Sequence, residues 1–194
     1  MTERGPGPGA RTAENGMEAN EYLEEATRQF RGLKKTADRA LAQVSDADFF
    51  AALDPESNSP ALIVKHLAGN MRSRWTDFLT SDGEKPDRHR DSEFVLEDGD
   101  TREDLMRRWE EGWALTFSAI GPLSAEDFRR TVEIRGQPHS ILRAINRQLV
   151  HYAYHVGQLV FLAKHFAGSR WETLSIPRGK SEEISKGLRL KSKV

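Results

Sequence analysis

The 194-residue chain contains no cysteine, and this absence removes several kinds of chemistry at once. It excludes disulfide scaffolds, thiolate metal sites and a cysteine nucleophile. Any reactive site must therefore be built from histidine, carboxylate or hydroxyl side chains. Because disulfide-bonded scaffolds are typical of secreted proteins, the lack of cysteine also favours a cytoplasmic location.

A surplus of charge of either sign is missing as well. The chain has 29 Lys and Arg against 30 Asp and Glu, which gives a formal net charge of -1. A protein that binds nucleic acid mainly through phosphates needs surplus cation to replace counterions, and a polybasic membrane anchor needs it too. No apolar run approaches the roughly 20 residues of a membrane helix, and the first fifteen residues lack the apolar centre of a signal peptide. We therefore expect no nucleic-acid partner and no membrane partner.

Composition divides the chain into one folded region and two tails. Residues 1–18 are rich in Gly and Pro and offer almost nothing to a core, so they predict a disordered tail. The Lys-rich residues 182–194 predict a flexible basic C-terminal tail. The folded region is then expected to span residues 19–181.

Four long stretches of this region repeat their apolar residues every three or four positions, as amphipathic helices do. Ser59 before Pro60, and Thr101 before Asp104, are typical helix starts. A polar connection at 80–100 separates the second helix from the third, and residues 131–137 predict a brief strand or extended connector. The sequence predicts an all-α four-helix bundle with a long crossover between helices 2 and 3, which then run parallel. The expected helices cover about residues 23–44, 60–78, 101–120 and 138–166.

Histidines carry the clearest chemical signal. His151 and His155 are four residues apart, which places both imidazoles on one helix face, one turn apart. They belong to a polar strip that runs between a broad apolar arc and a narrower one. We expect both arcs to be buried, so that the strip faces the bundle interior, where a divalent metal would satisfy two histidines at once. The strip contains Arg147, Gln148, His151, His155 and Gln158, and the narrower arc contains Val150, Tyr154 and Phe161.

His66, at the border of the apolar stripe of the second helix, is the expected third ligand. Three imidazoles with positions left open are typical of a catalytic metal site, and the ion would be Zn, Ni, Fe or Mn. Asn70 and Gln158, about one turn from a ligand, are expected to support the site or line its cavity rather than bind the metal. The alternative is that His151 and His155 are ordinary core or interface histidines, because the Glu of an HExxH motif is missing.

Two motifs resemble the DinB/YfiT-like superfamily of metalloenzymes: IVKHLAGNMRSRW around His66 and HYAYHVGQ with His151 and His155. The resemblance covers about residues 20–181, and KHLAGNMRSRWTDFLTSDGEKPDRHRD with LSIPRG is similar to a bacterial branch of unknown function. It implies a DinB-like four-helix bundle, a three-His metal site with bound water, and a homodimer. Relatives include thiol S-transferases that use mycothiol or bacillithiol, a mycothiol-dependent maleylpyruvate isomerase, and metal-dependent hydrolases. Only the ligands His66, His151 and His155 carry over, so the catalytic residues stay unknown.

Two classes of function remain. The first is a metal-dependent transferase or hydrolase that acts on a small-molecule substrate through a metal-activated thiol or water. The carboxylates of a low-molecular-weight thiol would then meet Arg147, a candidate cavity residue, or after it Arg178 and Arg74. The second is a non-catalytic stress-related or interaction protein with a structural metal. An open coordination position beneath a cavity would favour the enzyme.

Overall fold

The protein is mostly helical, as a computed structural model of residues 8–191 shows; side chains are described for residues 16–186. In this part of the chain, six α-helices and a two-stranded sheet follow one another. The predicted all-α class is therefore confirmed at this level. None of the described helices has both the length and the apolar character needed to cross a membrane.

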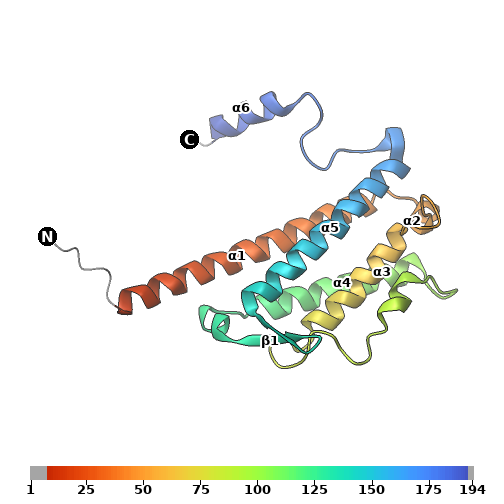
Figure 1. Cartoon of the computed structure of the whole chain (residues 1–194). Helices are drawn as coiled ribbons and strands as arrows, with labels where there is room; N and C mark the ends of the chain where they lie inside the picture. Colours follow the sequence, from red (N-terminus) through yellow and green to blue (C-terminus); the bar gives the residue numbers. More distant parts are fainter. Residues whose placement is uncertain (1–7, 192–194) are drawn as a thin grey trace.

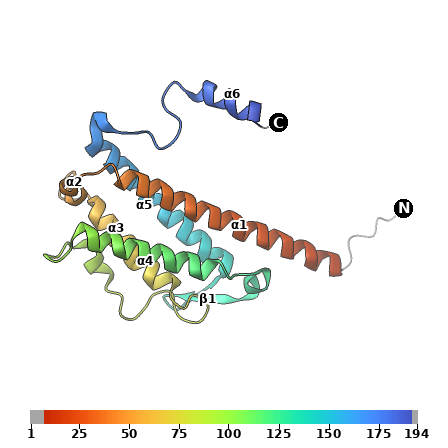
Figure 2. The same cartoon turned by 180° about the vertical axis from the view of Figure 1, so that it is seen from behind.

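Four long helices form the body of the molecule (Figures 1 and 2). They are α1 (Pro8–Leu41), α3 (Pro60–Trp75), α4 (Arg102–Ile120) and α5 (Ile141–Ala167). Helix α3 packs along α4, and α1 packs along α5. Both α3 and α4 run from the end near the short helix α2 (Asp46–Phe50) toward the hairpin, so they lie roughly parallel, as predicted.

The helices begin where the sequence supplies a capping side chain. The Ser59 hydroxyl accepts a hydrogen bond from the backbone N–H of Leu62 (3.2 Å), and Thr101 accepts one from Asp104 (3.1 Å). Each cap satisfies a backbone donor that has no partner inside the first turn. The starts of α3 and α4 were thus readable from local sequence.

An aromatic cluster joins the four long helices at the centre of the core. Each contributes one ring: Phe30 from α1, Trp75 from α3, Trp113 from α4 and Tyr152 from α5. The rings meet edge to face at centroid distances of 5.7–6.4 Å, a favourable arrangement of their quadrupoles. The Trp75 indole N–H donates to the Tyr152 hydroxyl (2.9 Å). This hydrogen bond joins α3 to α5 at Tyr152, the residue that follows His151.

Hydrogen bonds and ion pairs attach the long connection between α3 and α4 to helix α3. Ser73 donates to the carbonyl of Gly83 (2.8 Å), and Arg74 pairs with Glu84 (2.8 Å). Further on, the Lys65 ammonium binds Asp100 (2.6 Å). These anchors fold the connection back across α3, so that its 3₁₀ segment η1 (Arg90–Phe94) packs on that helix.

A hairpin precedes α5, and here the prediction was incomplete. Strands β1 (Thr131–Ile134) and β2 (Gln137–Ser140) pair antiparallel. Arg135 and Gly136 both have positive φ (58° and 67°), as a tight two-residue hairpin turn requires. The sequence does not predict the second strand, because a proline such as Pro138 is also typical of the first turn of a helix. Helix α5 instead begins at Ile141, capped by Ser140.

Both ends of the chain differ from the predicted tails. Helix α1 begins at Pro8, inside the segment 1–18, and α6 (Ser181–Lys191) occupies most of the segment 182–194. The remainder of these segments, residues 1–7 and 192–194, lies outside the described residues. Helix α6 stands apart from the body in both views (Figures 1 and 2).

Candidate metal centre

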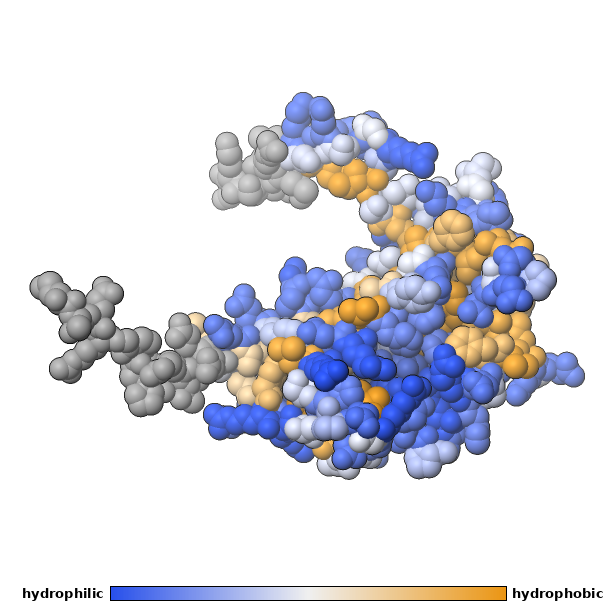
Figure 3. Space-filling view, viewed as in Figure 1, coloured by the Kyte–Doolittle hydropathy of each residue, from blue (hydrophilic) through white to orange (hydrophobic). Residues whose placement is uncertain are grey.

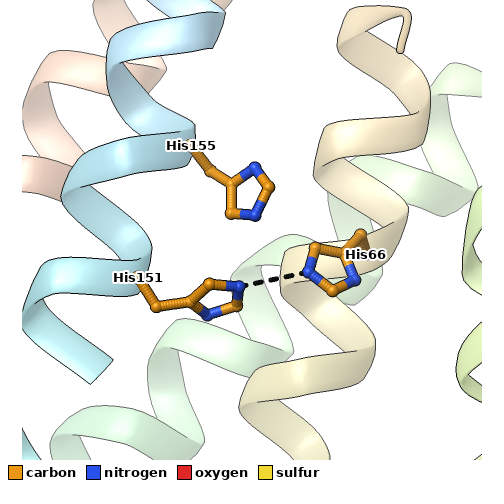
Figure 4. Close-up of side chains that lie close together, drawn as sticks. All are labelled: His66, His151 and His155. Atoms are coloured by element: carbon orange, nitrogen blue, oxygen red, sulfur yellow. Dashed lines mark hydrogen bonds between the residues drawn. The ribbon is translucent and has the colours of Figure 1, made fainter. Parts of the chain in front are cut away.

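Three histidines from two helices converge between α3 and α5. His66 comes from α3, and His151 and His155 come from consecutive turns of α5 (Figure 4). The Nε2 atoms of His66 and His151 are 3.2 Å apart, and one nitrogen from each of the three rings lies within 4.8 Å of the others. No other His, Asp or Glu among the described residues joins this group.

The outer nitrogens of two rings have fixed partners. Nδ1 of His66 lies 2.8 Å from Oε2 of Glu93, and Nδ1 of His155 lies 2.8 Å from Oε1 of Gln158. Because both partners are acceptors, each Nδ1 carries the proton and donates it. The Nε2 lone pairs of His66 and His155 are then available inside the group. This is the arrangement by which proteins orient metal-binding histidines.

Burial opposes protonation of the two histidines on α5. Desolvation, together with the charges of neighbouring histidines and arginines, lowers the pKa of His151 to about 3. Desolvation and the nearby His66 lower the pKa of His155 to about 4, although its hydrogen bond with Gln158 acts in the opposite direction. At neutral pH both rings are therefore uncharged. Neutral imidazole is the form that binds a metal ion.

Glu93 reaches His66 because α3 has no side chain at Gly69. An added Cβ at Gly69 would lie 2.8 Å from Cδ of Glu93, well inside van der Waals contact. Arg88 holds the same carboxylate through two hydrogen bonds (2.8 and 2.9 Å). Burial raises the pKa of Glu93, but the hydrogen bonds from His66 and Arg88 and the charge of Arg88 outweigh it and hold that pKa below its usual value. Glu93 is thus an ionised carboxylate behind the histidines.

A cavity of about 460 Å³ opens beside the three rings. Its walls include the predicted residues Asn70, which is buried, and Arg147, which is exposed. The aromatic rings of Phe94 and Tyr154 also line it. A small molecule in this cavity would lie against the nitrogens of the histidines.

The other sequence predictions near the site have mixed outcomes. Gln158 contacts His155 from outside the group, as described above. Arg74 lines the cavity while it pins the long connection, whereas Arg178 does not line the cavity. The expectation that both flanks of the polar strip are buried was wrong. The narrower arc is exposed: Val150 is 72 %, Tyr154 64 % and Phe161 64 % accessible.

Sequence reasoning missed the contribution of the long connection. Glu93 and Arg88 lie more than twenty residues from His66 in sequence, and no periodicity links them to it. One signal was present: a glycine in the middle of a helix, three residues after His66, often marks a close approach of another segment. Gly69 is that residue.

The comparisons with known proteins identify the family but not its activity. The family model of the protein of unknown function DUF1572 matches residues 17–180. The chain therefore belongs to this family. No curated protein matches the chain at a significant level.

Proposed function

We propose that this protein is a DinB-like, metal-dependent enzyme built on a four-helix bundle. One observation carries the proposal: three buried or half-buried imidazoles from two helices turn their nitrogens toward one point beside a cavity. Three protein ligands with a position left for water or substrate are typical of a catalytic metal site, whereas structural sites are closed by a fourth ligand. The reaction we propose is thiol S-transfer or hydrolysis of a small molecule.

The donor set fits a divalent ion. In a tetrahedral Zn²⁺ site the ligand nitrogens lie roughly 3.4 Å apart. His66 and His151 have about this spacing at 3.2 Å, and one nitrogen of His155 lies within 4.8 Å of both. In the absence of metal, the Nε2–H of His151 can donate to the Nε2 lone pair of His66, and a bound ion would take the place of this proton. Imidazole suits Zn, Ni, Fe and Mn, so the ligands do not select among these metals.

The bound ion would lower the pKa of a ligated water or low-molecular-weight thiol toward neutrality. The chain's own residues prepare the site for it. Glu93 keeps the Nδ1 proton on His66, and Gln158 does the same for His155. Phe94, in contact with the His66 ring at a centroid distance of 4.6 Å, keeps water from one side of that ring.

Metal analysis tests the proposal directly. Protein purified without nickel resin should contain about one Zn, Ni, Fe or Mn per chain by elemental analysis. After exchange with Co²⁺, addition of 2-mercaptoethanol should produce a thiolate-to-cobalt charge-transfer band, because the open position accepts a thiol. If the absorption spectrum of the cobalt-loaded protein does not change on addition of thiol or azide, the metal site is closed and the enzymatic proposal fails.

Gly69→Ala should weaken metal binding although it touches no ligand. The new methyl group would displace Glu93 from His66, and loss of such an outer partner usually lowers metal affinity about 10- to 100-fold. Isothermal titration with Zn²⁺ measures the change. Gly32→Ala is the matched control, since that glycine is exposed in α1 with nothing within 4 Å of an added Cβ. Equal Zn²⁺ affinity in the two variants would show that the contact between Glu93 and His66 does not contribute to metal binding.

We also propose a homodimer that covers the exposed apolar arc of α5. Exposed apolar stripes along a helix often mark an interface between copies of a chain. Phe161→Glu places a charge in this stripe without changing the cavity wall, so it should shift a dimer to monomer in light scattering after size exclusion. Arg143→Glu, on the same helix, should leave the mass unchanged. A monomeric wild type at micromolar concentration would contradict the proposal.

A further inference from the structure

Arginine dominates the cavity beside the three histidines. Five arginines line it, from α3, from the long connection, from the hairpin turn and from α5. None of the described residues that line the cavity is an aspartate or a glutamate. Figure 3 shows a strongly hydrophilic surface over the hairpin and the first turns of α5, two of the elements that carry these arginines. The five residues are Arg74, Arg88, Arg90, Arg135 and Arg147.

The carboxylates behind the cavity do not balance this charge. Glu84 is shared by Arg74 (2.8 Å), Arg88 (3.2 Å) and Arg135 (3.1 Å), and Glu93 is the second partner of Arg88. Three guanidinium groups thus form ion pairs with two carboxylates, and Asp82 at the hairpin turn adds a third negative charge, against five arginines in the cavity wall. Because all of these side chains lie behind or beside the cavity wall, a positive potential extends into the cavity.

The two remaining arginines add to the surplus. The nearest carboxylate to Arg90 is that of Asp91, an exposed group 3.8 Å away. Arg147 has no hydrogen bond or ion pair with any described residue. Its guanidinium is therefore available to a ligand, with its full set of donors.

Orphaned polar atoms give a second and independent sign of a ligand. Oδ1 of Asn70, Oε1 of Gln148 and Nε of Arg74 are buried without a hydrogen-bond partner, and all three residues line this cavity. The residues are only 5 %, 3 % and 5 % exposed. Buried polar groups almost always have partners, and leaving one unpaired is costly. Two of these atoms are acceptors and one is a donor, so the groups that satisfy them must include both donors and an acceptor.

We infer that this cavity binds a small organic oxyanion, a carboxylate or a phosphate ester, that also carries a hydroxyl group. The arginines hold the oxyanion, and the hydroxyl donates to Asn70 or Gln148. The volume of about 460 Å³ suits a molecule of this size. The inference rests on the proposed function in one respect, namely that the oxyanion is part of the substrate presented to the metal.

Four probes test separately whether binding needs the anionic group and whether it needs the hydroxyl group. They are glycerol 3-phosphate, glycerate, propyl phosphate and glycerol. Titration calorimetry should detect the first two in the millimolar range or below, and no binding of neutral glycerol. Propyl phosphate, which lacks hydroxyl groups, should bind about 2- to 10-fold more weakly than glycerol 3-phosphate, as expected for one hydrogen bond. Comparison of glycerate with glycerol 3-phosphate decides between carboxylate and phosphate.

Variants assign the binding to the cavity. Arg147→Glu should weaken glycerol 3-phosphate binding roughly tenfold or more, since a charge-assisted hydrogen bond becomes a repulsion. Arg143→Glu, four residues earlier on α5 and outside the cavity wall, is the charge-matched control and should have little effect. Gln148→Leu should reduce the preference for glycerol 3-phosphate over propyl phosphate without changing the binding of propyl phosphate.

Each titration is run on metal-loaded and on chelator-treated protein, with metal content measured in both. Anion binding that depends on Arg147 in the chelated protein would support the inference even if the wild type holds no metal, in which case the proposed function alone would fail. Metal binding without binding of any charged probe would overturn the inference and leave the metal site intact. Equal loss in Arg147→Glu and Arg143→Glu would also overturn it, because the attraction would then come from the overall charge.

Discussion

The His151→Ala variant is expected to have nearly the same melting temperature with and without Zn²⁺. Wild-type protein should be stabilised, because a ligand that binds only the native state contributes about 2.7 kcal/mol at a concentration 100-fold above its Kd. For a chain of this length this corresponds to a rise in Tm of roughly 5–10 °C. Removal of one imidazole from a three-histidine site should abolish most of that rise, since its Nε2 lies 3.2 Å from that of His66.

His165→Ala is the matched control for this measurement. His165 is an exposed histidine near the end of the same helix, so its loss removes an imidazole from α5 without touching the site. Its melting curves should keep the full response to Zn²⁺. A His151→Ala protein that still responds like wild type would exclude His151 as a ligand. A wild type with no response at any Zn²⁺ concentration would end the metal proposal.

The parts of the fold that were predictable are those fixed by local sequence. The spacing of four residues places His151 and His155 on one face of a helix whatever the rest of the chain does, and Ser59 and Thr101 cap their helices through contacts within one turn. His66 followed from its place at the border of an apolar stripe. These inferences need no knowledge of long-range contacts.

The parts that were not predictable depend on how distant segments meet. Glu93 contacts His66 only because the long connection folds back onto α3 at Gly69. Likewise, the helical wheel showed that Tyr154 and Phe161 form an apolar arc, but not whether another helix covers it. In the structure α1 and α3 cover the opposite flank of α5, and this arc faces outward. Periodicity identifies a face, whereas tertiary packing decides its neighbour.

Stability should fall with acid even in the metal-free protein. An unfolded histidine has a pKa of about 6.5, whereas burial lowers the pKa of His151 to about 3 and that of His155 to about 4 in the folded state. Below pH 6.5 the unfolded chain therefore binds protons that the folded chain does not. The stabilisation contributed by these two groups is present above pH 6.5 and is lost as the pH falls toward 4.

Chemical denaturation of chelator-treated protein between pH 7 and pH 5 measures this loss. At the lower end of that range the slope of the unfolding free energy against pH should correspond to between one and two more protons bound by the unfolded chain. Carboxylates whose pKa values are lowered in the folded chain, Glu84 and Glu93 among them, add to the slope near pH 5, so the contribution of the histidines is read from the difference between variants. His155→Gln should reduce the slope by up to one proton, whereas His165→Gln, which removes an exposed histidine, should leave it close to wild type. Equal slopes in wild type and His155→Gln would mean that His155 is protonated as easily in the folded chain as in the unfolded one.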